Sequence, residues 1–278
     1  KVVLNKLQLE PKKTLDLTRW NEFLYKFKNP KHSLKIGLVG KYVELQDSYK
    51  SILESLIHAG AINETEIQVI SIHSEKLNDK NVATKLNTLD GVIVAPGFGE
   101  RGIEGKIIAI AYARKHQIPF FGICLGMQMA VIEYSRNTVG LSSANSIEMD
   151  ENCKTPVIDL MEFQKSVVNK GGTMRLGAWD CSLSENSLAH KAYGSKTISE
   201  RHRHRYEFND AFKERIFDQD FVVTGINPET GLVEIIEYKK HPWFLGVQFH
   251  PEYKSTVSTP HPLFVSFIQA SLTNKSKA

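Results

Sequence analysis

The sequence predicts an α/β domain with a central, mostly parallel sheet, helices on both faces and extra antiparallel strands. Three observations predict it. Between residues 34 and 137, apolar stretches of strand length alternate with amphipathic stretches at helical spacing. The apolar stretches are continuous rather than alternating, as in strands buried on both faces. After residue 138 this rhythm changes and strand-like stretches follow one another between loops. Alternating strands and helices are typical of parallel βαβ units.

Composition sets the broad class of protein. The chain has 278 residues, 41% hydrophobic and 24% charged, which is enough for one sizeable core. A net charge of +4 is only mildly basic and does not by itself indicate a nucleic-acid partner. No apolar run approaches the roughly 18 residues of a membrane span, and no secretory signal is visible. Three cysteines do not suit a disulfide framework, so we expect a reducing, cytoplasmic setting.

Residues 1–33 are expected to be a linker that carries one helix. Residues 1–13 are polar with scattered apolar side chains. Residues 14–28 have amphipathic helical spacing, and Asn29-Pro30 would end that helix. The apolar positions of this helix are Leu17, Trp20, Leu24 and Phe27. Because the chain begins with Lys1 rather than Met, we expect it to be a piece of a longer protein.

Residues 34–278 are expected to form one domain. Within it, Asp47 should cap the first helix and Gly60 should end it. The predicted strands of the first half are 34–40, 66–72, 90–96 and 119–123, and its helices are 47–60, 102–117 and 125–137. The second half has strand-like stretches at 172–183, 197–208, 221–226, 232–238 and 243–249, and a final helix at 263–272.

A cysteine between two glycines stands where the strand 119–123 meets the next helix, in the run GICLG. A nucleophile on so sharp a turn needs small neighbours, as in the G-x-S-x-G elbow of hydrolases. The positive end of a helix dipole would favour the thiolate of Cys124, and the Leu125 N–H would face an oxyanion. The alternative is that Cys124 is a small core residue. Cys153 and Cys181 lack this context and are interpreted as structural.

A second motif, HPE, ends the strand-like run GVQF. In an extended segment, positions 250 and 252 point to the same side, so Glu252 could hold the His250 imidazole in one tautomer. Together with Cys124 this predicts a Cys-His-Glu triad. An ordinary strand end with a hydrogen-bonded histidine is the alternative.

Two further stretches are candidates for binding. The turn APGFGERG follows the strand 90–96, and its glycines would let backbone N–H groups approach a ligand. No Walker or dinucleotide motif is present, which weakens a phosphate cradle. An oxyanion-hole loop is favoured, because it would lie in the same sheet as the cysteine, and an ordinary turn is the alternative. The run RHRHR, residues 201–205, would alternate on a strand, with arginines on one side and histidines on the other. A solvated basic face, a phosphate or nucleic-acid patch and a histidine metal site are its alternatives.

Taken together, these motifs resemble those of a known enzyme family. PGFG, GICLGMQ and HPE, in this order on a βα framework, resemble the class I glutamine amidotransferases, whose fold is flavodoxin-like. GFGERGIEGK, ANSIEMD, GGTMRLGA and ERHRHRYEFN narrow the resemblance to the glutaminase domains of CTP synthases, over about residues 34–272. Many members have Pro-Gly-Gly-Phe-Gly where this chain has Ala95-Pro96-Gly97-Phe98-Gly99. Proline has no N–H, so the oxyanion donor of this loop should be Gly97.

The resemblance implies a reaction and roles for residues. Cys124 would attack the side-chain amide of L-glutamine and form a γ-glutamyl thioester, with His250 as acid and base and Glu252 orienting it. Gly97 and Leu125 would form the oxyanion hole. Arg205 would pair with the substrate α-carboxylate, and Arg201 and Arg203 would be structural or lie near the ammonia route. The remaining substrate contacts implied are Gly97, Phe98, Gln128 and Glu148.

The resemblance also implies partners. The ammonia would serve the ATP-dependent amination of UTP to CTP in a synthetase domain, which residues 1–33 would join to this one. ATP and Mg would bind in that domain, since this chain has no Walker motif, and GTP would activate the enzyme. No cofactor, metal, nucleic acid or membrane is expected for residues 34–278, and the full-length enzyme would be a homo-oligomer, a tetramer. A γ-glutamyl hydrolase, a cysteine peptidase or a non-catalytic module on the same fold are the alternatives.

Overall fold

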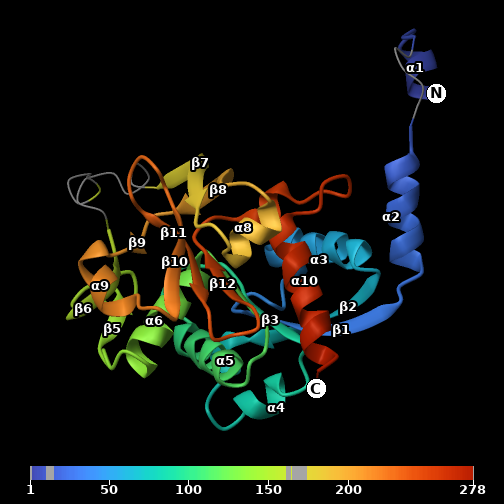
Figure 1. Cartoon of the computed structure of the whole chain (residues 1–278). Coiled ribbons are helices and arrows are strands. Elements are labelled where there is room, and N and C mark those ends of the chain that lie inside the picture. The colour runs from blue at the N-terminus through green and yellow to red at the C-terminus, as the bar shows by residue number, and fades with distance from the viewer. Residues whose placement is uncertain (1, 11–15, 161–163, 165–173, 278) are drawn as a thin grey trace.

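The computed structural model describes residues 2–10, 16–160, 164 and 174–277, and its centre is one large sheet (Figure 1). The strands of this sheet are β1 (His32–Gly40), β2 (Thr65–His73), β3 (Gly91–Val94), β4 (Phe120–Ile123), β7 (Arg175–Leu183), β8 (Thr197–His204), β10 (Phe221–Ile226), β11 (Val233–Tyr238) and β12 (Phe244–Val247). Their spatial order is β2-β1-β3-β4-β12-β11-β10-β7-β8.

The sheet has a parallel and an antiparallel half. From β2 to β12 each neighbouring pair is parallel, and from β12 to β8 each pair is antiparallel. This confirms the predicted class: the βα units before residue 138 supply four of the parallel strands, and the chain after it supplies the antiparallel ones. The predicted strand at 172–183 begins at Arg175, and its positions 172 and 173 lie outside the described residues.

Helices cover both faces of the sheet, because side chains on each strand alternate between two apolar layers. Leu38 and Phe121 pack with α3 (Lys50–Ile62) and α10 (Pro262–Lys275). Val39 and Phe120, one position away, pack on the opposite face with α5 (Ile103–Lys115) and α6 (Leu125–Asn137). The shorter helices are α1 (Val2–Lys6), α4 (Val82–Leu86), α8 (Leu188–Tyr193) and α9 (Lys213–Ile216).

A second, smaller sheet was not predicted. It is formed by β5 (Ala144–Ser146), β6 (Thr155–Asp159) and β9 (Glu207–Phe208). The predicted strand 197–208 is therefore two strands: β8 ends at His204, and residues 207 and 208 pair with β6 instead. Short 3₁₀ turns complete the described chain at η1 (Gln46–Tyr49), η2 (Ser74–Lys76), η4 (Asp210–Phe212) and η5 (Pro251–Lys254).

Both expected ends of the helix 47–60 were wrong. Asp47 lies in η1, and α3 begins only at Lys50, so Asp47 is not its N-cap. Gly60 lies inside α3, which continues to Ile62. A Cβ at Gly60 would lie 2.7 Å from the Thr65 carbonyl oxygen, so this glycine permits close packing of the helix on the start of β2 rather than ending the helix.

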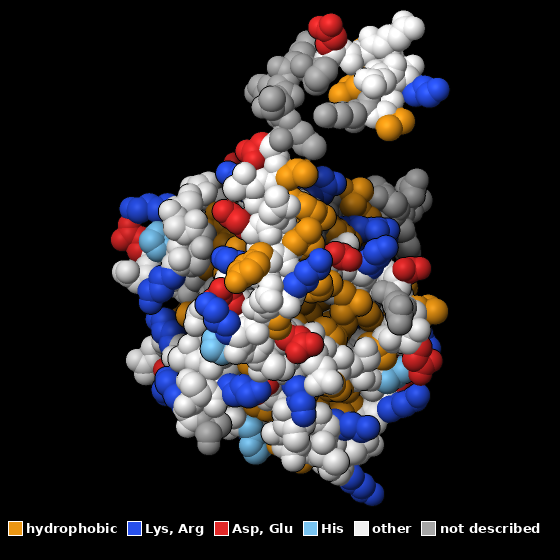
Figure 2. Space-filling model, turned by 90° about the vertical axis from the view of Figure 1, so that its right-hand side faces the viewer, with side chains coloured by type: hydrophobic (Ala, Val, Ile, Leu, Met, Phe, Trp, Pro, Cys, Tyr) orange, Lys and Arg blue, Asp and Glu red, His pale blue; other side chains and the backbone are white. Residues whose placement is uncertain are grey.

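The helix predicted at residues 14–28 lies on the surface as α2 (Thr18–Lys28), which starts four residues later than predicted. Residues 14 and 15 lie outside the described chain. It contacts α3 through Phe23, whose ring packs edge-on against His58 with 6.1 Å between centroids. Most of its predicted apolar face remains exposed, including Trp20 and Phe27 at 48% and 49%. Figure 2 faces this side and shows hydrophobic side chains at the surface among charged ones. No helix in the described ranges is both long and apolar enough to cross a bilayer.

Candidate active site

Three of the predicted motifs meet because their strands are neighbours. β3, β4 and β12 are adjacent and parallel, so their carboxyl ends lie at one edge of the sheet. The Ala95–Gly97 loop follows β3, Cys124 follows β4, and His250 lies three residues after the end of β12. The Cys124 N–H donates a hydrogen bond to the Val247 carbonyl at 2.7 Å, which ties two of the motifs together.

The backbone at Cys124 is a tight bend of the predicted kind. Its φ of 52° and ψ of −105° lie outside the regions that L-residues commonly adopt, and α6 starts at the next residue. A Cβ at Gly126 would lie 2.2 Å from the Val94 carbonyl oxygen, and one at Gly122 would lie 2.8 Å from the Gly126 backbone. Both flanking glycines are therefore required by close approach of the backbone.

His250 and Glu252 are brought together by a turn rather than by an extended strand. The His250 Nδ1 lies 2.7 Å from the Glu252 Oε1, and both side chains are buried. Residues 251–254 form η5, so the expectation that 250 and 252 share one side of an extended segment was wrong. Proline at the first position of this turn suits its fixed φ. The backbone N–H of His250 donates a hydrogen bond to the Arg201 carbonyl at 2.8 Å, which anchors this turn to β8.

The surroundings of His250 favour its charged form. Burial acts to lower its pKa, but the Cys124 thiolate and the Glu252 carboxylate outweigh burial and raise the pKa from 6.5 to about 11. Among the described residues the His250 Nε2 has no oxygen or nitrogen partner, and the Cys124 side chain is the neighbour that acts on the imidazole besides Glu252. An imidazolium with one nitrogen on a carboxylate and the other beside a sulfur can act as a general acid.

A cavity of about 490 Å³ opens over these groups. Phe98 is 65% exposed, and Arg205 is half-buried, with its guanidinium close enough to act on the pKa of Glu148. The predicted site residues that line the cavity are Gly97, Phe98, Cys124, Gln128, Glu148, Arg205 and His250. Glu252 lies behind His250, and Leu125 is the first residue of α6. No acceptor among the described residues is bonded to the N–H of Gly97 or Leu125, so both donors remain open.

Glu148 supports the loop after β3 as well as lining the cavity. Its Oε1 accepts a hydrogen bond from the Gly99 N–H at 2.8 Å, and the Lys41 amino group donates to the Phe98 carbonyl. Burial raises the pKa of Glu148, while the Gly99 N–H and the nearby Arg205 act in the opposite direction. One carboxylate oxygen thus fixes the loop, and the group can present its other oxygen to a cation in the cavity.

Sequence reasoning missed Gln248. The Gln248 Nε2 lies 3.7 Å from the Cys124 Sγ, within reach of a weak N–H···S hydrogen bond, and the Gln248 Oε1 accepts from Gln128 at 3.1 Å. Gln128 gives its other N–H to the Tyr206 carbonyl at 3.0 Å, so only its Oε1 is left for a ligand. The signal was available, because positions 248 and 250 both follow β12 within three residues, in the run GVQFHPE.

From Arg201 to His204 the run RHRHR alternates as predicted, but β8 ends at His204, so Arg205 lies beyond the strand. Arg201 and Arg203 are exposed, whereas His202 and His204 are buried. The His202 Nδ1 lies 2.8 Å from the His204 Nε2, so one ring donates and the other accepts. Burial lowers the pKa of His202 to about 2 and that of His204 to about 3, and the second cause for His204 is the charge of Arg175. Within the described ranges no cluster of three or more His, Cys, Asp or Glu is arranged to hold a metal ion.

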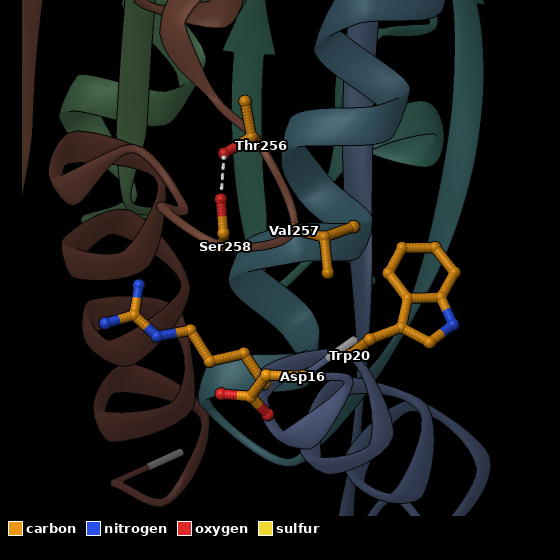
Figure 3. A pocket seen from close by; sticks show the side chains of 6 residues that line it. Asp16, Trp20, Thr256, Val257 and Ser258 are labelled. Atoms are coloured by element: carbon orange, nitrogen blue, oxygen red, sulfur yellow. Dashed lines mark hydrogen bonds between the residues drawn. The ribbon is translucent and has the colours of Figure 1, made fainter. Parts of the chain in front are cut away.

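A second groove, shown in Figure 3, does not carry comparable chemistry. It measures about 420 Å³ and lies between α2 and the loop at Thr256–Ser258, with Trp20 and Val257 on its walls. The Thr256 and Ser258 hydroxyls hydrogen-bond to each other at 3.2 Å. No cysteine or histidine lines this groove, so the cavity over Cys124 is the candidate active site.

Comparison with known proteins places this site in a family. The family model for glutamine amidotransferase class-I matches residues 44–270. The CTP synthase of Flavobacterium psychrophilum is 65% identical over 277 residues, and that of Christiangramia forsetii is 66% identical over 270. These matches cover 100% and 97% of this chain but 52% and 50% of the relatives. The chain therefore spans about half the length of the curated relatives it matches.

Solved structures agree with this assignment. The glutaminase domain of Trypanosoma brucei CTPS, with bound acivicin, is 37% identical with a TM-score of 0.81. That match covers 86% of this chain and 94% of the Trypanosoma brucei chain. A putative GMP synthase protein from Thermoplasma acidophilum, at 16% identity and a TM-score of 0.56, shares the fold over 88% of this chain and 96% of its own.

Proposed function

The chain belongs to the class I glutamine amidotransferases, among them to the glutaminase domains of CTP synthases, and we propose that it hydrolyses L-glutamine to glutamate and ammonia. The observation that carries this proposal is the group at one edge of the sheet. Cys124 stands on a strained bend at a helix N-terminus, opposite an imidazole that is hydrogen-bonded to a buried carboxylate. These are the parts that nucleophilic attack on an amide needs.

In the first step, the Cys124 thiolate attacks the side-chain amide carbon of glutamine and forms a C–S bond. The N–H groups of Gly97 and Leu125 hold the oxyanion of the tetrahedral intermediate. The His250 imidazolium gives its Nε2 proton to the amide nitrogen, the C–N bond breaks, and ammonia leaves. The result is a γ-glutamyl thioester on Cys124 and a neutral His250.

In the second step, the neutral His250 takes a proton from water while the water oxygen attacks the thioester carbon. The C–S bond then breaks, glutamate leaves, and the thiolate and imidazolium are restored. Glu252 stabilises the imidazolium that forms in this step, since its Oε1 faces the Nδ1 at 2.7 Å. Both steps balance without a metal or redox partner.

The charged groups around the cavity match the two charges that glutamine carries on its α-carbon, the α-carboxylate and the α-ammonium. We assign the Arg205 guanidinium to the α-carboxylate, because a planar fork binds a carboxylate with two hydrogen bonds. We assign the free oxygens of Glu148 and Gln128 to the α-ammonium, and Phe98 to the cover of the cavity. Support for this assignment is that all four residues line the same cavity as Cys124.

The ammonia is proposed to serve a synthetase part of a longer protein, which would aminate UTP to CTP using ATP and Mg²⁺, with GTP as activator. The half-length coverage of the CTP synthase relatives supports this division. The exposed apolar face of α2, with Trp20 and Phe27, is where we propose that part to pack. Residues 1–33 would then join the two parts.

Incubation with glutamine and with a diazoketone analogue of glutamine tests the proposal. We expect release of ammonia and glutamate, and one covalent adduct that peptide mass spectrometry locates on Cys124. An adduct on Cys153, or none, would contradict the proposed nucleophile. Cleavage of γ-glutamyl peptides with glutamine ignored would instead favour a γ-glutamyl hydrolase or a peptidase. The adduct is the sharper readout, because it forms even where turnover is slow.

A further inference from the structure

A buried lysine that the reaction scheme does not use lies beside the active site. Lys106, on the first turn of α5, is 1% exposed, and its Nζ donates a hydrogen bond to the Ala95 carbonyl at 2.7 Å. No carboxylate in the described part of the chain lies within ion-pair distance of it. Burying an ammonium without a counter-ion costs several kcal/mol, so a role that offsets this cost should exist.

The place of Lys106 indicates that role. Ala95 immediately precedes Pro96 and Gly97, the loop with the proposed oxyanion donor. A Cβ built on Gly97 would lie 3.6 Å from the Lys106 Nζ, so the ammonium lies directly against this loop. Burial lowers the pKa of Lys106 to about 7, and the nearby Cys124 acts to raise it. A thiolate and the ammonium therefore stabilise each other.

The fold alone does not explain a charge at this position. A lysine at a surface helix usually extends its amino group into water, whereas this one points inward at a carbonyl. A methionine has nearly the same length and would fill the space without a desolvation cost. Arg114, on the same helix, is the structural counterpart: its guanidinium makes two hydrogen bonds to Glu133, at 2.8 and 2.7 Å.

We propose that Lys106 is a positioning residue for glutamine hydrolysis: it holds the Ala95 carbonyl so that the Gly97 N–H faces the cavity, and its charge favours the Cys124 thiolate and the oxyanion. This inference rests on the proposed function. Lys106 touches no substrate in this scheme and acts through the loop and through the field that it creates at the sulfur.

Alkylation of Cys124 by iodoacetamide tests the inference without requiring turnover. The rate at Cys124 is followed by peptide mass spectrometry between pH 5 and 9 in the wild-type chain, Lys106→Met and the control Arg114→Met. For Lys106→Met we expect the rate at pH 7 to fall about tenfold and the pH of half-maximal rate to rise by about one unit. The charged groups His250, Lys41 and Glu148, which also face this region, are the same in each variant.

The two variants should separate chemistry from stability. Lys106→Met should melt close to the wild-type temperature, because removal of a buried ammonium offsets the loss of the hydrogen bond to the Ala95 carbonyl, while its alkylation slows. Arg114→Met leaves Glu133 buried without its cationic partner, so it should melt lower but keep the wild-type alkylation profile. A Lys106→Met profile that coincides with wild type would overturn the inference.

A second substitution covers the case in which Lys106→Met does not fold. Lys106→Gln keeps a donor for the Ala95 carbonyl and removes only the charge. We expect the same upward move of its alkylation profile, and an unchanged profile would overturn the electrostatic role. If the wild-type chain releases no ammonia from glutamine while the Lys106 variants still differ in alkylation, the proposed function fails and the inference about the thiolate stands.

Discussion

Two buried cysteines in this molecule have nearly equal exposure and opposite surroundings. Cys124 is 5% exposed and Cys181 is 0% exposed. The Cys181 Sγ packs against Gly225, where an added Cβ would lie 2.8 Å from the sulfur, and burial followed by the charge of Glu234 raises the pKa of its thiol. Cys124 instead stands at the start of α6, beside the imidazole of His250.

The difference teaches that a buried thiol is unreactive unless its neighbours favour the thiolate. The groups around the sulfur, and not its burial alone, therefore decide whether it can react. Around Cys181 the strongest nearby charge is a carboxylate, which opposes ionisation. Around Cys124 the neighbours are the imidazolium of His250, the ammonium of Lys106 and an amide N–H of Gln248. The cavity also gives a substrate access to Cys124.

The largest expected effect comes from removing the reactive member of this pair. Cys124→Ala should lower glutaminase activity by about 10⁴-fold or more, since no second cysteine among the described residues lines the cavity. Ammonia release from glutamine measures it, with Cys181→Ala as the matched control. Ammonia release that survives in Cys124→Ala would contradict the assignment of Cys124 as the reactive cysteine of the two.

The next effect comes from the group that orients the base. Glu252→Gln keeps the shape of the side chain but removes the charge that stabilises the imidazolium, and we expect a loss of about 10² to 10⁴-fold in kcat. Steady-state kinetics measure the loss. Glu66→Gln on the exposed side of β2 serves as a control for removal of a carboxylate. Equal activity of both variants would show that Glu252 does not act on His250.

Acid should destabilise the fold through the buried histidine pair of β8, His202 and His204. The His202 Nε2 lies 3.6 Å from the Glu234 Oε2, and both His202 and His204 have pKa values lowered by burial to about 2 and about 3. The unfolded chain binds these protons near pH 6.5 and the folded chain does not, so stability is full above pH 6.5 and falls below it. We expect up to about 1.4 kcal/mol per pH unit for each histidine.

Urea unfolding at pH 7, 6 and 5 measures this loss. A His204→Asn variant should give a flatter dependence on pH than the wild type, because one of the two linked protons is removed. Parallel curves for the two proteins would mean that His204 is already charged in the folded state.

The smallest effect is expected from Cys181→Ala. Removing one buried sulfur next to Gly225 should cost about 1–2 kcal/mol of unfolding free energy. Glutaminase activity should stay within about twofold of wild type, since Cys181 does not line the cavity. Chemical denaturation and the ammonia assay measure the two quantities. A loss of activity without a loss of stability would give Cys181 a role that its surroundings do not explain.

The parallel half of the fold and the bend at Cys124 could be predicted, because each depends on local pattern. Continuous apolar strands between amphipathic helices indicate βαβ units, and Gly122 and Gly126 mark a backbone that tolerates no side chain. The small sheet of β5, β6 and β9 could not be predicted in this way. Its strands are two to five residues long and contain polar residues such as Asn145, so no period is visible in them.

Interactions that depend on packing were also missed. Lys106 occupies a position in a helical pattern where a lysine normally faces water, and only the fold shows that it points at the Ala95 carbonyl. Gln248 lies two residues before the histidine of the HPE motif, yet its contact with Cys124 joins segments 124 residues apart. Gly60 was assigned to the end of a helix, because close packing against the Thr65 carbonyl is not visible in one dimension.

Competitive alkylation of the three cysteines under native conditions tests the central claim most directly. At neutral pH and a small excess of iodoacetamide, we expect Cys124 to be modified at least about 10²-fold faster than Cys181, and faster than the half-exposed Cys153. Modification of Cys153 ahead of Cys124, or equal rates at Cys124 and Cys181, would contradict the claim that the groups around Cys124 make its sulfur reactive.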